Sequence, residues 1–226
     1  MFEMKSKAGS KYRYIIFDFD GTINNTAPGI VATFKRVLDM YRVDYSDVDF
    51  NKHIGPPLEY SFKELVGGDR WREALETYRR IFEETNAVRN SFLYDGIVDT
   101  LKKLYDEGFV LSVATSKYEP FALQSLEMLG ISGYFSCLYG QTEKRGFKDE
   151  ILRQLIGDNG WNKSQCLMIG DTCYDVNGAR ANGIDVMAVT YGFEKADKLE
   201  EAKPDYIAHS TKDIVTILVE EEDEKK

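Results

Sequence analysis

Residues 12–22 read YRYIIFDFDGT, a mostly apolar run that ends in two aspartates, a glycine and a threonine. A short run of consecutive apolar residues is typical of a strand that is buried on both faces of a parallel sheet. Asp18 and Asp20 stand two residues apart at its end, so their side chains leave the backbone in the same direction. Because ligands bind beyond the carboxyl ends of strands in open parallel sheets, this stretch predicts both a fold class and the position of a site.

The sequence after residue 94 alternates between strand-like and helix-like segments. The expected strands are 109–115, 136–139, 166–169, 186–189 and 206–208, and the expected helices are 97–107, 119–129, 147–156, 173–182, 195–202 and 212–219. Strands that alternate with helices of this length predict a parallel sheet covered by helices on both faces. We therefore expect an α/β fold with a doubly wound, Rossmann-like core.

The residues between the first strand and this alternating region have a different pattern. Pro28 stands where a helix could begin, and apolar residues follow it at helical spacing as far as Tyr41. Residues 46–90 contain no convincing strand, are broken by Pro56 and Pro57, and carry further helix-like faces. We predict a core domain made of residues 1–24 and 94–226, with a small helical cap domain, residues 25–93, inserted after the first strand.

Polar side chains follow several of the predicted strands. Residues 18–22 follow the first strand, residues 115–117 a later one and residues 171–175 another, while Lys148 opens a helix between the last two. The carboxyl ends of parallel strands meet at one edge of a sheet, so we expect these groups to lie close together. Four acids, a hydroxyl and a lysine at one edge are suited to moving a phosphoryl group through a carboxylate nucleophile.

The chemistry of the residue types suggests a role for each. Asp18 is the candidate nucleophile, because an ionised aspartate can attack phosphorus. Two anions need help to approach, so a hard cation such as Mg²⁺ would bridge Asp18, Asp171 and the substrate phosphate. Asp20 is the candidate acid and base, protonating the leaving alcohol and later deprotonating water. Lys148 would neutralise phosphate charge, and Thr115 would hydrogen-bond a phosphoryl oxygen.

Four stretches together resemble the motifs of the haloacid dehalogenase superfamily, in that family's order. They are DFDGTI from Asp18, VATS ending at Ser116, Lys148, and GD-x-x-x-D from Gly170. The resemblance covers essentially the whole chain. The helical insertion resembles the subgroup with a small α-helical cap, which includes phosphoglycolate phosphatases, nucleotidases and β-phosphoglucomutases.

The resemblance implies roles for the matching positions. Asp18 would be the nucleophile and a Mg²⁺ ligand, and Asp20 the acid and base, with a backbone carbonyl that also binds Mg²⁺. Asp171 would be a further ligand, and Asp175 would hold metal-bound water. The full predicted set is catalytic residues Asp18, Asp20, Thr115 and Lys148, phosphate-binding residues Gly21, Thr22 and Ser116, and metal-binding residues Asp18, Asp20, Asp171 and Asp175.

Some positions leave alternatives open. Lys148 is followed by an aspartate where many relatives carry proline, so Lys144 competes for its role. Lys148 is preferred because the stretch KDEIL from Lys148 resembles the start of this helix in nucleotidase-like members of the family. A lysine in the first turn of a helix also opposes the helix dipole, which indicates an anionic partner. Ser116 with Glu119, and Thr172 with Asp175, also match the sequence of a capping box. Capping is the more ordinary role for Ser116, whereas for Asp175 both roles are compatible.

The leading functional hypothesis is a Mg²⁺-dependent phosphatase of a small phosphate monoester. The main alternative is a phosphomutase, which would use the same aspartyl phosphate but pass the group to a sugar hydroxyl. A dehalogenase is disfavoured, because the resemblance implies that this chemistry dispenses with the acid at Asp20. A phosphate-switched receiver module is disfavoured by the inserted helices. Phosphoglycolate, a nucleoside monophosphate and a sugar phosphate all stay open as substrates.

Composition limits the partners. The 226 residues carry a formal net charge of −9, which argues against non-specific binding of nucleic acid or of an anionic membrane. We expect a small phosphorylated metabolite as partner. The three cysteines form no Cys-x-x-Cys pair, and no stretch has the length of a signal peptide core or a membrane span, so we expect a reduced, cytoplasmic protein. Oligomeric state and the start, Met1 or Met4, stay open.

Overall fold

The computed structural model describes residues 10–85 and 87–220, so both possible starts and the acidic residues beyond 220 lie outside the description. A six-stranded sheet has the order β5-β4-β1-β6-β7-β8, and all neighbouring strands in it are parallel. The strands are β1 Tyr14–Phe17, β4 Val110–Tyr118, β5 Phe135–Gln141, β6 Cys166–Gly170, β7 Asp185–Val189 and β8 Tyr206–Ala208. This arrangement confirms the predicted doubly wound α/β fold.

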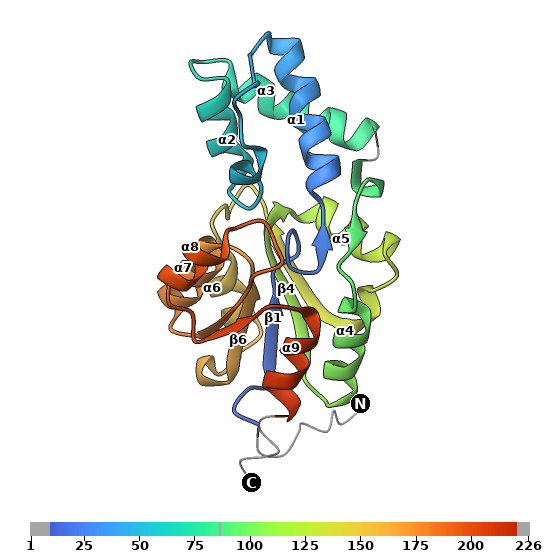
Figure 1. The fold of residues 1–226 in the computed structure, drawn as a ribbon, viewed down its shortest axis with the longest axis vertical. Coiled ribbons are helices and arrows are strands. Elements are labelled where there is room, and N and C mark those ends of the chain that lie inside the picture. The colour runs from blue at the N-terminus through green and yellow to red at the C-terminus, as the bar shows by residue number, and fades with distance from the viewer. Residues whose placement is uncertain (1–9, 86, 221–226) are drawn as a thin grey trace.

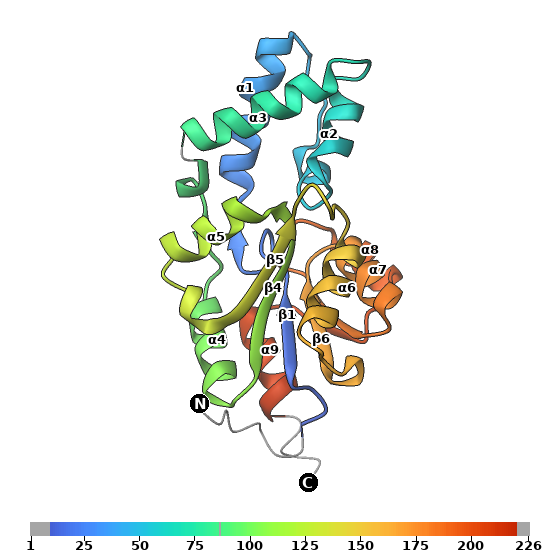
Figure 2. The ribbon, with the colours of Figure 1, turned by 180° about the vertical axis from the view of Figure 1, so that it is seen from behind.

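Helices cover both faces of the sheet, as Figures 1 and 2 show. They are α4 Ile97–Asp106, α5 Glu119–Met128, α6 Lys148–Asp158, α7 Cys173–Asn182, α8 Ala196–Glu201 and α9 Thr211–Val215, the last continued by a π-helical turn at Thr216–Glu220. Short 3-10 helices occur at Phe50–His53, Ala87–Arg89, Ser132–Tyr134 and Lys163–Gln165.

The first strand lies in the middle of the sheet and is buried on both sides. Ile15 and Phe17 pack into a cluster with α4, α5 and α9 on one face, whereas Ile16 packs with α6 and α7 on the other. All three side chains are fully buried. The uninterrupted apolar run in the sequence therefore reflects a strand that contacts helices through both of its faces.

The segment that follows the first strand forms a separate group of helices, α1 Ala27–Tyr41, α2 Leu58–Leu65 and α3 Trp71–Glu84. These helices have a hydrophobic cluster of their own, in which Phe34 contacts Phe62 and Tyr78. Figures 1 and 2 show this helical unit above the sheet, at one end of its strands.

Two chain segments connect the helical unit to the sheet domain. Strand β2, Asn24–Asn25, pairs antiparallel with β3, Phe92–Leu93, so the outgoing and returning segments run side by side. The boundaries predicted at residues 25 and 93 fall within this ribbon. The ribbon itself was not predicted, because two-residue strands leave no periodic pattern in a sequence.

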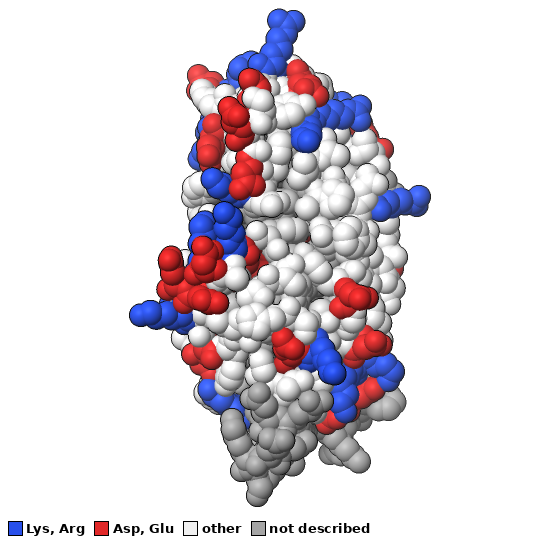
Figure 3. Space-filling model, in the orientation of Figure 1, with Lys and Arg blue, Asp and Glu red and all other residues white. Residues whose placement is uncertain are grey.

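Charged side chains of both signs are mixed around the face drawn in Figure 3, and its centre is mostly uncharged. Within residues 10–85 and 87–220, no helix combines the length and the apolar character that crossing a membrane requires. On this face a phosphorylated ligand would therefore meet no extended basic surface, and local groups would have to attract it.

Candidate active site

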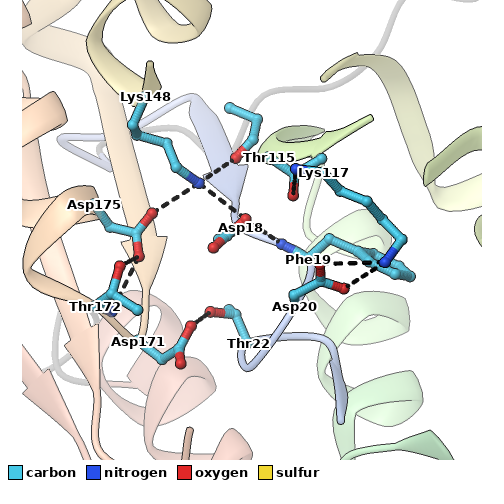
Figure 4. Close-up of polar contacts among 11 residues, drawn as sticks. Asp18, Phe19, Asp20, Thr22, Thr115, Lys117, Lys148, Asp171, Thr172 and Asp175 are labelled. Atoms are coloured by element: carbon cyan, nitrogen blue, oxygen red, sulfur yellow. Dashed lines mark hydrogen bonds and ion pairs between the residues drawn. The ribbon is translucent and has the colours of Figure 1, made fainter. Parts of the chain in front are cut away.

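Asp18 lies at the end of β1, where the sheet meets the helical unit. Its backbone N–H donates to the carbonyl of Ile169 on β6, at 2.8 Å. Its Oδ1 accepts the N–H of Phe19 at 2.7 Å and lies 2.9 Å from Nζ of Lys148. The side chain is almost fully buried. Neighbouring strands and two donors thus fix the orientation of this carboxylate (Figure 4).

Lys148 is the first residue of α6 and lies in the same buried cluster. Its Nζ is 2.9 Å from Asp18 Oδ1 and 2.8 Å from Asp175 Oδ1, and it donates to the carbonyl of Ala114 at 2.9 Å. Burial opposes its charged form, but the two carboxylates outweigh burial and raise the pKa of Lys148. Lys144, the competing candidate, is exposed on the loop before α6. The structure therefore places Lys148 and not Lys144 beside Asp18.

Asp171 follows β6 and is held against the loop after β1. Its Oδ1 accepts the hydroxyl of Thr22 at 3.1 Å, and its Oδ2 accepts the N–H of Phe193 at 2.8 Å. Gly21 has a φ of +89°, and a Cβ added there would lie 2.1 Å from Asp171 Oδ2. Only glycine allows this backbone to approach the carboxylate so closely.

Asp175 connects the start of α7 to Lys148. Its Oδ2 accepts the N–H of Thr172 at 3.0 Å and the Thr172 hydroxyl at 2.7 Å, while Oδ1 pairs with Lys148. The predicted capping box at Thr172 is therefore confirmed. The predicted capping box at Ser116 is wrong, because α5 begins at Glu119 with Tyr118 before it, and the Glu119 carboxylate accepts the N–H of Gly140 at 2.9 Å.

Three carboxylates meet in this cluster beside Lys148. Asp18, Asp171 and Asp175 each offer an oxygen, all within 4.8 Å of one another, and all three residues are buried. Burial raises the pKa of Asp18 to about 7, against the opposing effect of Lys148 and with a further contribution from Asp175. Burial, followed by the charges of Asp175 and Asp18, raises the pKa of Asp171 well above its usual range.

The excess of negative charge and the oxygen-only donors fit a hard divalent cation. Mg²⁺ is bound by carboxylate oxygens, and its charge would offset the repulsion among the acids. Asp18, Asp171 and Asp175 could hold such an ion. Asp20, predicted as a further metal-binding residue through its backbone carbonyl, contributes no carboxylate oxygen to this group.

Asp20 instead pairs with a lysine that the predicted site did not include. Nζ of Lys117 lies 3.2 Å from Oδ1 and 3.3 Å from Oδ2 of Asp20. The Lys117 side chain is 7% exposed and lies over the rings of Phe19 and Phe82. Lys117 stands two residues after Thr115 on β4. Because side chains two apart on a strand point to the same side, the sequence could have indicated that Lys117 lies with the catalytic candidates.

The predicted phosphate-binding residues fall into two groups. Ser116 lines the cavity beside Asp18, as does the predicted catalytic residue Thr115, whose hydroxyl accepts the N–H of Lys117 at 3.2 Å. Thr22 is fully buried and donates its hydroxyl to Asp171, and Gly21 packs against the same carboxylate. The side chain of Thr22 therefore supports Asp171, and phosphate binding by Gly21, Thr22 and Ser116 stays a prediction.

A cavity lies between the sheet domain and the helical unit, with Asp18 and Asp20 in its wall. The helical unit contributes mainly apolar and aromatic residues, which the predicted set of site residues did not include. The cavity is lined by Asp18, Asp20, Thr115, Ser116, Lys117, Tyr118 and Phe121 from the sheet domain, and by Ile30, His53, Ile54, Gly55, Pro56, Leu58, Tyr78, Arg79 and Phe82 from the helical unit. The buried His53 has a lowered pKa, because burial disfavours its charged form.

Known proteins resemble this chain in sequence and in fold. The family model for haloacid dehalogenase-like hydrolases matches residues 15–189. A 5′-nucleotidase of Pseudomonas aeruginosa is 35% identical over 202 residues, which cover 87% of this chain and 91% of that protein. The tyrosine-protein kinase PtkA of Mycobacterium tuberculosis is 33% identical over 208 residues, which cover 91% of this chain and 71% of that protein.

Solved structures agree with the sequence relatives. The crystal structure of a predicted phosphatase from Clostridium acetobutylicum has a TM-score of 0.88 and 34% identity, and the match covers 93% of this chain and 100% of that one. The family model spans well over half of the chain and includes the loops that carry Asp18 and Asp171. The protein is therefore an enzyme of the haloacid dehalogenase-like hydrolase family.

Proposed function

We propose that this hydrolase is a Mg²⁺-dependent phosphatase that acts on a small phosphate monoester through an aspartyl phosphate on Asp18. The observation that carries the proposal is the position of the Asp18 carboxylate. It is held by Lys148 within a buried group of acids, and it lines the same cavity as Asp20. A carboxylate fixed in this way is oriented for attack on phosphorus.

In the first step, an oxygen of Asp18 forms a bond to phosphorus while the bond between phosphorus and the ester oxygen breaks. The carboxyl group of Asp20 gives its proton to the departing oxygen, which leaves as an alcohol. Lys148 keeps Asp18 oriented and offsets negative charge on the phosphoryl group. A Mg²⁺ ion held by Asp18, Asp171 and Asp175 would supply the positive charge that lets the two anions approach.

In the second step, water attacks the phosphorus of the aspartyl phosphate. Asp20, now a carboxylate, accepts a proton from that water, and the bond between phosphorus and Asp18 breaks. Inorganic phosphate leaves and both aspartates return to their starting states. Lys117, which contacts both oxygens of Asp20, would keep this carboxylate in place through the two proton transfers.

A phosphomutase would share the first step and is the alternative that the motifs leave open. Family membership and the name of the P. aeruginosa relative, a 5′-nucleotidase, favour transfer to water. The M. tuberculosis relative is named a tyrosine-protein kinase, whereas the reaction proposed for this chain is hydrolysis. Phosphate release without any sugar bisphosphate activator distinguishes hydrolysis from the mutase reaction.

The proposal extends to the surroundings of the site. The helical unit would act as a cap that closes over the substrate and excludes bulk water during transfer. Its buried hydrophobic cluster consists of residues of the helical unit, and Phe121 and Phe193 of the sheet domain pack against it. The partner would be a small phosphorylated metabolite, and the protein would work in the cytoplasm.

The test is phosphate release from a panel of small phosphate esters, measured with Mg²⁺, with EDTA, and with purified Asp18→Asn. We expect release that EDTA and the substitution both abolish. Acid-stable, base-labile phosphate on the wild-type chain, trapped during turnover and missing from Asp18→Asn, would support the intermediate. Appreciable turnover by Asp18→Asn would rule out the proposed nucleophile.

A further inference from the structure

Helix α3 of the helical unit turns one side toward the catalytic edge of the sheet domain. The charge of Asp20 contributes to the raised pKa of Tyr78, which burial raises first, and the Phe82 ring lies 5.2 Å from Nζ of Lys117. Tyr78 and Phe82 are four residues apart and so share a side of the helix. Arg79 lies between them in sequence, and it lines the same cavity.

Arg79 brings a permanent positive charge to this cavity. Among the described residues that line it, the lysines and arginines are Lys117 and Arg79. Lys117 is 7% exposed and is already engaged by both oxygens of Asp20, so it is poorly placed to bind another anion. An anionic group on the leaving part of a substrate would therefore find Arg79.

The present contacts of Arg79 leave much of its binding capacity unused. Nη1 donates to Glu76 at 2.8 Å, but the Glu76 side chain is 69% exposed, and such surface pairs are weak. The guanidinium group lies 5.5 Å from the centre of the Tyr118 ring, which orients it from the sheet domain. Within the described part of the chain, the buried Nε has no hydrogen-bond partner.

Arg79 also lines an outer groove, so both spaces share this side chain. It lines the groove formed by α2, α3 and the loop at residues 141–146, together with Trp71 and Arg72. A guanidinium group that lines both spaces can contact a ligand in either of them. Its planar fork of donors matches a carboxylate or phosphate group better than a point charge does.

We propose that Arg79 selects substrates whose leaving group carries a second anionic group, a carboxylate or a phosphate, beside the phosphoryl group that is transferred. This assignment rests on the proposed phosphatase function and narrows its substrate class. The aromatic side chains around Arg79 lower the local polarity. An ion pair formed there therefore contributes more binding free energy than one in water. Phosphate esters with an uncharged leaving group would lack this contact.

The experiment compares two esters of similar size, 2-phosphoglycolate with its carboxylate and ethyl phosphate without one. The readout is the ratio of the two kcat/KM values. Variants are Arg79→Gln, Arg79→Lys, Glu76→Gln and a matched control, Arg80→Gln. Arg80 follows Arg79 on α3, is 59% exposed and pairs with Glu84 away from the cavity lining.

The wild-type enzyme is expected to prefer 2-phosphoglycolate. Arg79→Gln should lower the ratio by roughly ten- to a hundredfold, mainly through KM, because a charge-assisted hydrogen-bonded pair is lost. Arg79→Lys should lower it less, and Arg80→Gln and Glu76→Gln should keep it. A wild-type enzyme without the preference, or an Arg79→Gln variant that keeps it, would overturn the proposal. So would a Glu76→Gln variant that loses the preference, because the effect would then come from the ion pair within α3.

A binding measurement separates this inference from the proposed function. Calorimetric titration of Asp18→Asn with 2-phosphoglycolate needs no turnover, and adding Arg79→Gln should weaken binding by a similar factor. If no ester is hydrolysed, the proposed function fails, while weaker binding by the double variant still supports the role of Arg79. Equal affinity of the single and double variants would overturn that role whether or not the enzyme turns over.

Discussion

Nζ of Lys117 lies within 3.3 Å of both carboxylate oxygens of Asp20, although 97 positions separate the two residues. The contact joins the last part of β4 to the loop after β1. Both side chains are nearly buried, at 7% and 12% exposure, so the pair is shielded from solvent more than a surface pair would be. The residue proposed to move protons is therefore held in place by a cation from a neighbouring strand.

Replacing Lys117 tests whether that contact supports catalysis. Lys117→Met keeps the length of the side chain and its contact with Phe82 but removes the ammonium group. Because Asp20 then loses its ionic partner, we expect kcat to fall by roughly ten- to a hundredfold with the fold intact. Steady-state kinetics would measure this loss. Lys102→Met, on the exposed side of α4, is the control, and equal effects of the two substitutions would count against a role for Lys117.

The two candidate lysines near α6 give a sharper comparison. Lys148 contacts Asp18 and Asp175, whereas Lys144 is exposed four residues earlier. Lys148→Met leaves buried carboxylates without their cation, so we expect turnover to fall by at least a thousandfold. Lys144→Met should stay within about twofold of the wild-type rate. The measurement is Mg²⁺-dependent phosphate release, and similar mild losses in both variants would show that neither lysine has the proposed role.

The sequence predicted the site best where its position in the fold follows from strand order. Asp18 and Asp171 end adjacent strands, β1 and β6, so a parallel sheet alone brings them together. Lys148 was predicted from its place at the start of a helix, and its anionic partners agree with that argument. These predictions needed the order of elements, the direction of their ends and, for Lys148, the resemblance to the family.

Other features depended on contacts between distant segments, which a single sequence does not reveal. Glu119 was expected to help cap a helix with Ser116, but Gly140 and Arg145 on a neighbouring segment engage it. The hydroxyl of Thr22 donates to Asp171, a contact that the sequence did not indicate, and phosphate binding by Thr22 stays a prediction. The cavity residues of the helical unit, such as Arg79, depend on how α3 docks on the sheet domain, and no periodic pattern records that docking.

The buried acids predict how stability depends on pH when Mg²⁺ is removed. Burial raises the pKa of Asp18 to about 7, so the folded state binds its proton more tightly than the unfolded state does. The protonated Asp18 therefore makes its full contribution to stability at pH values below the usual pKa of an aspartate. This contribution is lost as the pH rises from about 4 to 7. In EDTA, we expect the Tm to drop across this range, and Asp18→Asn should flatten part of that drop.

Added Mg²⁺ should reverse this trend, because the cation favours the ionised acids. Thermal unfolding in EDTA and in Mg²⁺, at several pH values from 5 to 8, would measure both effects. The stabilisation by Mg²⁺ should grow with pH and be smaller in Asp18→Asn, which loses one candidate ligand. An Mg²⁺-induced change in Tm that is the same at all pH values would contradict a cation bound by these carboxylates.

Gly21 offers a test of the same site through the backbone alone. Its φ of +89° disfavours other residues, and a Cβ there would lie 2.1 Å from Oδ2 of Asp171. Gly21→Ala should therefore destabilise the fold by about 1–3 kcal/mol and push Asp171 out of position. We expect weaker Mg²⁺ stabilisation and much slower turnover, measured by thermal unfolding and phosphate release.

Gly130 supplies the matched control for that substitution. It also has a positive φ, +69°, but a Cβ there would meet no atom within 4 Å. Gly130→Ala should lower stability only through the strained backbone conformation. Its Mg²⁺ stabilisation and turnover should stay close to those of the wild-type enzyme. If Gly21→Ala resembled Gly130→Ala in all three measurements, the close packing of the loop after β1 against Asp171 would not matter for the metal site.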